Sequence, residues 1–241
     1  MRSPTKLSKI TAGLARYAGQ KRLASEKRAI VACILRPSTS TADDHEALFI
    51  LRSGGDGRWA GQVAFPGGHV EDDESDHEAV SRECKEEVGL ELDQPGAYTF
   101  LGATQQLRVP FARELVVACR VYEQAAHASR PRGLQTKEVA ACGWCSLAAL
   151  RADNIAVPLK WAASHPGADP GEWDSFPSVQ LPIRDVQISV GSPIETEGSS
   201  GVDSKFLLWG LTLHLVNDLL TTTGLRAKPI ELEHAAGDPK L

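Results

Sequence analysis

The chain has 241 residues, of which 42% are hydrophobic and 24% charged, as is usual for a folded globular domain. Its longest apolar stretch, Phe206–Val216, is interrupted by Thr212 and His214, so no stretch approaches the roughly 18 residues of a transmembrane helix. A formal net charge of −5 argues against nucleic-acid binding through a general positive field. Composition therefore excludes a typical membrane-spanning or nucleic-acid-coating protein and leaves most enzyme classes open.

In chain order, the sequence pattern predicts an α+β domain. The predicted elements are an amphipathic helix at 7–17, strands at 29–35, 47–51 and 62–65, a helix at 75–88, strands near 98–104, 114–122 and 138–144, a short helix at 146–151, loops with short strands at 153–204, and a buried helix at 205–220. We expect helices packed on one sheet. The expected division is a basic N-terminal segment with the first helix (1–28), a main domain (29–222) and a C-terminal tail (223–241).

Charge is distributed unevenly along the sequence. The first 28 residues hold eight Lys and Arg residues but one acid, Glu26. The segment 71–91 holds ten carboxylates against Arg82 and Lys85. So dense an acidic cluster costs self-repulsion, which a bound cation would offset. A solvated acidic helix face is the alternative interpretation, and the spacing of the acids has to decide between the two.

The helix predicted at 75–88 carries three glutamates on one face. Glu83, Glu86 and Glu87 stand at i, i+3 and i+4, so their carboxylates are neighbours. Like charges at this spacing destabilise a helix, whereas clustered carboxylate oxygens are the ligands that a hard divalent cation prefers. Ser75 or Asp76 is expected to cap the start of this helix and Gly89 to end it.

Residues near this face are expected to support it. Arg82 can pair with Glu74 and hold the preceding loop against the helix, which is a structural rather than a chemical role. Gly67 and Gly68 form a predicted turn that lets the backbone approach a ligand closely. The carbonyl of Gly68 can then add a metal ligand, and the helix N-terminus favours an anionic phosphate.

Written out, this region resembles the Nudix box over its full 23 residues. The matching pattern is Gly68-x5-Glu74-x7-Arg82-Glu83-Cys84-x-Glu86-Glu87-x-Gly89-Leu90, in which only Cys84 departs from the usual aliphatic residue. A nine-point match at fixed spacing is far more specific than a single glycine motif. The resemblance implies an α/β/α sandwich with a mixed sheet, and metal-dependent hydrolysis of a nucleoside diphosphate linked to another moiety.

The resemblance also implies roles for the matched positions. Glu83, Glu86 and Glu87 would be the catalytic and metal-binding residues, with Gly68 as a further ligand of Mg²⁺ or Mn²⁺. The metal would neutralise the diphosphate and lower the pKa of a bound water that attacks phosphorus. The general base differs among Nudix enzymes; we favour Glu86 or Glu87, with Glu138 as the alternative.

The segment before the box resembles the extra motif of coenzyme A (CoA) diphosphatases. It reads Leu51-Arg52-Ser53 and then Gly61-Gln62-Val63-Ala64-Phe65-Pro66-Gly67-Gly68. Gly57 stands where that motif has a second arginine, and Arg58 is displaced by one position. The resemblance implies that CoA or acyl-CoA is split to 3′,5′-ADP and a phosphopantetheine, with four candidate substrate-binding residues. These are Arg52, Arg58, Gly67 and His69.

Two other functions stay open at this point. The substrate could be another nucleoside diphosphate derivative: ADP-ribose, NADH, a dinucleoside polyphosphate or an oxidised deoxynucleoside triphosphate. The chain could instead be a non-catalytic Nudix-fold binding module, although the presence of every metal-binding glutamate argues against it. In each case the expected partner is a small molecule rather than nucleic acid or a membrane, and the sequence does not indicate the oligomeric state.

The cysteines and the chain ends bear on the compartment. The chain has five cysteines, an odd number, and no hydrophobic leader is recognised in the sequence. We therefore expect reduced thiols inside the cell. Cys142 and Cys145 have the spacing of a redox or zinc pair, but we predict that they pack structurally. The final Pro239-Lys240-Leu241 resembles the Ser-Lys-Leu peroxisomal signal, while the basic N-terminus also suits a mitochondrial presequence. We expect a peroxisomal or cytosolic protein, with mitochondria as the alternative.

Overall fold

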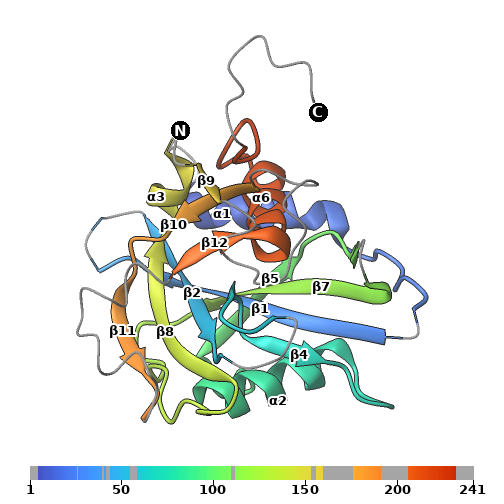
Figure 1. The fold of residues 1–241 in the computed structure, drawn as a ribbon. Coiled ribbons are helices and arrows are strands. Elements are labelled where there is room, and N and C mark those ends of the chain that lie inside the picture. Colours follow the sequence, from blue (N-terminus) through green and yellow to red (C-terminus); the bar gives the residue numbers. More distant parts are fainter. Residues whose placement is uncertain are drawn as a thin grey trace, which may run out of the picture.

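A mixed β-sheet forms the centre of the computed structural model (Figure 1). The structure describes residues 5–25, 27–39, 41, 44–54, 59–109, 112–152, 156–159, 176–190 and 206–231. Within them, the nine strands of this sheet are β1 (Lys27–Pro37), β2 (His45–Arg52), β3 (Val63–Ala64), β4 (Gly67–His69), β5 (Tyr98–Ala103), β6 (Leu107–Val109), β7 (Ala112–Gln124), β8 (Val139–Ser146) and β11 (Arg184–Ile188).

The main path of the sheet runs in the order β11-β8-β2-β1-β7-β5. Strands β3, β4 and β6 pair with β2, β1 and β7, outside this path. The β1–β7 pair is parallel and the other pairs are antiparallel, which makes the sheet mixed. β1 is a nearly continuous apolar run because it lies between strands and under helices on both faces.

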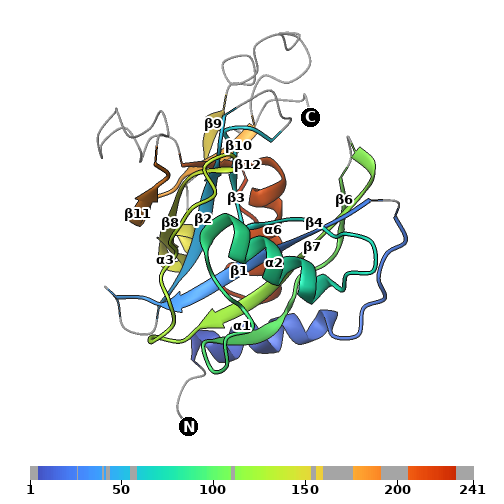
Figure 2. The same ribbon diagram turned by 90° about the horizontal axis from the view of Figure 1, so that it is seen from below.

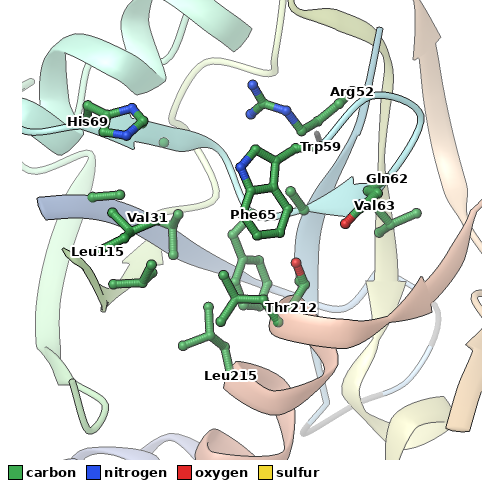
Figure 3. A pocket seen from close by; sticks show the side chains of 16 residues that line it. Val31, Arg52, Trp59, Gln62, Val63, Phe65, His69, Leu115, Thr212 and Leu215 are labelled. Atoms are coloured by element: carbon green, nitrogen blue, oxygen red, sulfur yellow. The ribbon is translucent and has the colours of Figure 1, made fainter. Parts of the chain in front are cut away.

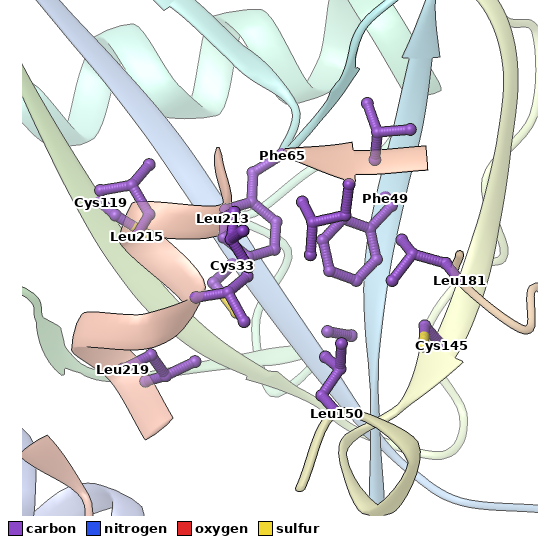
Figure 4. Packing of buried hydrophobic residues seen from close by; sticks show 14 of the residues in the cluster. Cys33, Phe49, Phe65, Cys119, Cys145, Leu150, Leu181, Leu213, Leu215 and Leu219 are labelled. Carbon is purple, nitrogen blue, oxygen red and sulfur yellow. The ribbon is translucent and has the colours of Figure 1, made fainter. Parts of the chain in front are cut away.

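Helices cover both faces of the sheet (Figures 1 and 2). Among the described residues, the helices are α1 (Lys6–Leu14), followed by a 3-10 turn (Ala15–Tyr17), α2 (Asp76–Val88), α3 (Leu147–Arg151) and α6 (Gly210–Thr222). Alternate residues of β1 enter two separate cores: Ile30 packs with α2, whereas Cys33 packs with residues of α1 and α6. Figure 4 shows Phe49 and Phe65 among leucines of α6 in the second core. The predicted α/β/α sandwich is confirmed.

Local signals set the limits of α2, the helix that carries the acidic cluster. The Ser75 hydroxyl accepts from the Glu78 amide at 3.2 Å, and Glu78 Oε2 accepts from the Ser75 amide at 2.8 Å, which is a capping box. At the other end Gly89 adopts the left-handed conformation with φ 66°. Its amide and that of Leu90 satisfy the carbonyls of the last turn. The predicted cap and end of this helix are therefore confirmed.

The predicted helix over 205–220 is wrong at its start. Leu207–Trp209 form strand β12, and the helix begins only at Gly210, whose φ is 59°. β12 pairs with β10 (Phe176–Gln180), which also pairs with β9 (Val157–Leu159) in a three-stranded sheet. Backbone pairing across some thirty residues of sequence thus overrides a local apolar pattern that suits a helix. Among the described helices, none is long and apolar enough to cross a membrane.

Candidate active site

The two glycines before α2 lie in a strand and not, as predicted, in a turn. In β4, Gly67 pairs with Val31 and Gly68 pairs with Ile30 of β1. A Cβ on Gly67, where φ is 144°, would collide with the backbone of Ile30, and a Cβ on Gly68 would collide with the carboxylate of Glu83. Glycine is required at Gly67, where the clash is with backbone and φ is positive, because β4 packs closely against β1 on one side and the glutamates of α2 on the other.

Arg82 connects the loop to α2, as its predicted structural role requires. Its Nε donates to Glu74 Oε1 at 2.8 Å and its Nη2 to Glu74 Oε2 at 3.0 Å, a two-point ion pair. Nη2 also donates to the carbonyl of His69 at 3.0 Å, and Nη1 donates to Glu83 Oε1 at 2.9 Å. The carboxylates around it raise the pKa of Arg82, so this side chain is a fixed positive charge.

Three carboxylates meet beside β4. Oxygen atoms of Glu83, Glu87 and Glu138 all lie within 4.8 Å of one another; we call these residues the carboxylate cluster. Glu138 reaches it from the turn before β8, so the residue predicted as an alternative base joins two box glutamates. Glu86 lies outside this group: its side chain is 55% exposed and Oε2 is 3.4 Å from Nη1 of Arg82.

Glu87 is the most buried member of the cluster, with 1% of its side chain exposed. Burial raises its pKa to about 8, against the opposing effects of the Gly67 amide and Arg52. Gly67 N donates to Oε2 at 2.7 Å, while Oε1 is buried and accepts no hydrogen bond from the described residues. Nη1 of Arg52, at 3.6 Å from Oε1, lies beyond hydrogen-bond distance. One carboxylate oxygen therefore has only the more distant charge of Arg52 to offset its own charge.

A pocket that is open to solvent adjoins β4 on the side of the sheet that faces α6 (Figure 3). Its polar rim includes Arg52 and His69, next to Gly67 and Gly68. Its wall is mostly apolar and comes from β1, β3, β7, α6 and the turn before β3. The wall residues include Val31, Trp59, Phe65, Leu115, Leu211 and Leu215.

The pattern of the box and this fold place the chain in a known family. The NUDIX domain model matches residues 26–165, more than half of the chain. The chain belongs to the Nudix family. No curated protein matches it closely enough for comparison.

Several solved structures are similar to part of this Nudix chain. A MutT Nudix hydrolase from Burkholderia pseudomallei is 27% identical, with 49% of this chain and 81% of that one covered and a TM-score of 0.37. A MutT protein from Methanosarcina mazei Go1 is 26% identical over 51% and 79%, also with a TM-score of 0.37. An Ap4A hydrolase from C. elegans is 18% identical over 51% and 81%, with a TM-score of 0.38. TM-scores this low support no argument about the substrate.

Family membership makes the chain a Nudix pyrophosphohydrolase that acts on a nucleoside diphosphate derivative, a small molecule. Nudix enzymes use divalent metal ions, and the carboxylate cluster suits such an ion. Its donors are hard oxygen atoms, and within the described part of the chain Oε1 of Glu87 is buried without a hydrogen-bond partner. A like-charged cluster with an unsatisfied buried oxygen is costly unless a cation binds it. Glu83, Glu87 and Glu138 are thus suited to hold Mg²⁺ or Mn²⁺.

The substrate-binding residues predicted from the sequence fall into two groups. Arg52, Gly67 and His69 all line the pocket, next to the carboxylate cluster. Arg58 lies outside the described residues. Trp59 also lines the pocket and was not singled out from the sequence; a large aromatic residue in a glycine-rich turn before the motif was the available signal.

The Cys-x-x-Cys spacing has a structural explanation. Cys142 belongs to the core under α2 and Cys145 to the core on the other face of the sheet, because residues three apart in a strand point to opposite sides. Both thiols are free and buried, and burial raises the pKa of each to about 12. The predicted packing role is confirmed, and the geometry does not form a redox or zinc pair.

Proposed function

We propose that this Nudix enzyme hydrolyses CoA or acyl-CoA to 3′,5′-ADP and the corresponding phosphopantetheine. The main support is that Arg52 and Gly67, which both contact Glu87 of the carboxylate cluster, also line a pocket with a cationic rim and an apolar wall. A diphosphate at the rim would leave a long arm of low polarity to enter the pocket, and acyl-CoA combines these two parts. The Arg52-Ser53 and Phe65-Pro66-Gly67-Gly68 segments add the resemblance to CoA diphosphatases.

In this proposal the chain binds the metal ion, orients the diphosphate and deprotonates the attacking water. Glu83, Glu87 and Glu138, with Glu86 and the Gly68 carbonyl as the further ligands predicted from the sequence, would hold Mg²⁺ or Mn²⁺. When bound, the cation supplies positive charge for the diphosphate and makes water more acidic. Arg52 at the rim orients the diphosphate.

Proton removal from the attacking water requires an accessible carboxylate. We assign this step to an oxygen of Glu138, which is exposed and adjoins both Glu83 and Glu87. Glu86 is the box alternative because its side chain is also exposed. Glu87 is less suited because its carboxylate is buried and one oxygen accepts from Gly67.

A substrate panel with Mg²⁺ and with Mn²⁺ tests the proposed function. The panel contains CoA, acetyl-CoA, a longer acyl-CoA, ADP-ribose, NADH, a diadenosine polyphosphate and oxidised dGTP, with products separated by chromatography. We expect the highest kcat/KM for CoA or an acyl-CoA, with release of 3′,5′-ADP. Preference for another compound would retain the Nudix chemistry and reject CoA. Metal binding without any turnover would instead support the binding-module alternative.

The displaced arginine gives a sharper test of the CoA assignment. We expect Arg58→Ala to raise KM for CoA about 10-fold, since one charge-assisted contact to phosphate contributes about 1.5–3 kcal/mol. Dephospho-CoA, which lacks the 3′-phosphate, is the internal control and should show a smaller change. Steady-state kinetics on both substrates measures the difference. Equal effects on the two would remove Arg58 from recognition of the 3′-phosphate.

We also propose a peroxisomal or cytosolic location and a Nudix domain at 29–222. The support for peroxisomes is the terminal Pro239-Lys240-Leu241, which lies outside the described residues. A fluorescent protein fused before residue 1, with and without these three residues, tests the address. Peroxisomal fluorescence that depends on the tripeptide would support the peroxisomal address. Mitochondrial fluorescence of a second fusion, in which the fluorescent protein follows residue 241 and the N-terminus is free, would support the presequence instead.

A further inference from the structure

The turn that carries Glu138 is attached on two sides. On one side, Ser53 Oγ donates to the carbonyl of Thr136 at 2.9 Å, and the Ser53 amide donates to the carbonyl of Glu138 at 2.8 Å. On the other side, the Gln135 amide donates to the carbonyl of Glu87 at 3.2 Å. The 135–138 turn therefore lies between the end of β2 and the end of α2.

An irregularity in the sheet follows immediately after this turn. Leu51 of β2 pairs with Ala141 of β8, but the next residue, Arg52, pairs with Val139, so that Ala140 is an extra residue on β8. Such a bulge changes the direction of neighbouring side chains and is frequent beside active sites. The buried Ser189 holds it from the far side: its amide donates to the carbonyl of Ala140 at 2.9 Å and its hydroxyl donates to that of Val139.

These attachments oppose a repulsive force. Glu138 is exposed, and its carboxylate lies within 4.8 Å of those of Glu83 and Glu87. Ionised carboxylates at such separations repel one another, and a side chain on a surface turn can easily move away. A backbone that is fixed by other residues limits how far the Glu138 carboxylate can move from the cluster.

We propose that Ser53 is a positioning residue, which keeps the Glu138 carboxylate at the cluster by fixing the backbone of the 135–138 turn. The inference rests on the proposed function, because it gives Glu138 a part in metal-dependent hydrolysis. Ser53 acts only through Glu138 and does not itself contact the reacting atoms. The residue after Arg52 thus has a defined role: Arg52 faces Glu87, and Ser53 holds Glu138.

A double-mutant cycle tests this role. We expect Ser53→Ala to lower kcat about 10-fold and to weaken Mn²⁺ binding, the usual scale for a residue that orients a ligand. KM should change less than kcat. Ser53→Thr, which keeps the hydroxyl, should restore activity. In a Glu138→Gln background, Ser53→Ala should cause little further loss because the group that it positions is already disabled. Steady-state kinetics and calorimetric Mn²⁺ titration supply the two readouts.

Thr136→Ala is the matched control, since it removes a hydroxyl from the same turn but leaves the carbonyl that accepts from Ser53. It should retain wild-type kcat and Mn²⁺ affinity. If Ser53→Ala does not fold, as judged by thermal unfolding, Ser53→Val compared with Ser53→Thr gives the same test at equal side-chain size. Wild-type activity in Ser53→Ala, or an equal loss with and without Glu138→Gln, would overturn the inference.

The Mn²⁺ titration separates this inference from the proposed function. If the wild-type protein cleaves no member of the substrate panel, the proposed function fails. Ser53→Ala should nevertheless weaken Mn²⁺ binding when Glu138 is present and leave it unchanged in Glu138→Gln. An unchanged affinity in both backgrounds would contradict the positioning role whatever the substrate.

Discussion

Glu46 and Glu87 are both buried glutamates, but their surroundings differ. Glu46 lies near the start of β2 and is fully buried; its Oε2 accepts from Arg36 Nε at 2.9 Å and from Nη2 at 2.7 Å. The Arg36 guanidinium also stacks over Trp144 at 4.2 Å and pairs with Asp185. Glu87, near the other end of β2, has one amide donor, one unsatisfied oxygen and an arginine at 3.6 Å.

The difference separates a structural charge from a functional one. A buried ion pair with satisfied hydrogen bonds is internally complete and needs no ligand. A buried carboxylate with an unsatisfied oxygen, next to two other carboxylates, is stabilised only when a cation or a proton is added. Burial alone therefore does not identify an active-site residue in this chain, whereas the incomplete compensation of the Glu87 charge does.

The largest expected effect is on catalysis at Glu87. We expect Glu87→Gln to lower kcat about 100- to 1000-fold, the scale of losing a principal electrostatic group. The variant should melt no lower than the wild type without metal, because glutamine replaces a carboxyl group whose charged form is disfavoured by burial. Steady-state kinetics and thermal unfolding in EDTA measure the two effects. Glu86→Gln is the companion variant predicted from the sequence to lose at least about 100-fold; normal turnover in both would refute the metal-site assignment.

The second effect, at Glu46, is a loss of stability with little change in catalysis. We expect Glu46→Ala to lower the free energy of unfolding by about 3 kcal/mol, because it leaves the buried Arg36 without its main partner. At a temperature where the variant is folded, kcat per folded molecule should stay near the wild-type value. Urea unfolding and kinetics on the same preparation test both statements. A loss of turnover without a loss of stability would contradict the structural role.

The third effect is the dependence of stability on pH without metal. The pKa of Glu87 is about 8 in the folded chain, against about 4.3 for an unperturbed glutamate. Because the folded state holds this proton more tightly, the stabilisation by proton binding is lost as pH rises from about 4.3 through 8. Urea unfolding in EDTA should therefore show the wild type losing stability relative to Glu87→Gln between pH 5 and 8. Parallel pH profiles for the two proteins would contradict the raised pKa.

The smallest effect concerns Asp185, the second carboxylate that pairs with Arg36. Asp185 contacts the same guanidinium as Glu46, but its side chain is 45% exposed. We expect Asp185→Asn to lower the free energy of unfolding by at most about 1 kcal/mol, because solvent screens an exposed pair. Asparagine also tolerates the positive φ of 50° at this position. If Asp185→Asn lowered the free energy of unfolding as much as Glu46→Ala does, the exposure of Asp185 would not explain a difference between the two partners of Arg36.

The sequence by itself determined the features that depend on short separations along the chain. The capping box at Ser75, the end of α2 at Gly89 and the pairing of Arg82 with Glu74 all lie within sixteen residues. Helical periodicity fixes which of these side chains share a face, so spacing alone predicts them. The family followed from the same local pattern.

Only the tertiary structure decided which carboxylates meet. Glu138 joins Glu83 and Glu87 because the sheet brings β8 beside β2, whereas Glu86, although on the predicted face, remains exposed. The pocket likewise combines the turn before β3 with α6, and β12 replaces the start of a predicted helix. These outcomes depend on contacts between residues far apart in sequence, whose free energy arises from packing and strand pairing and leaves no local periodic signal.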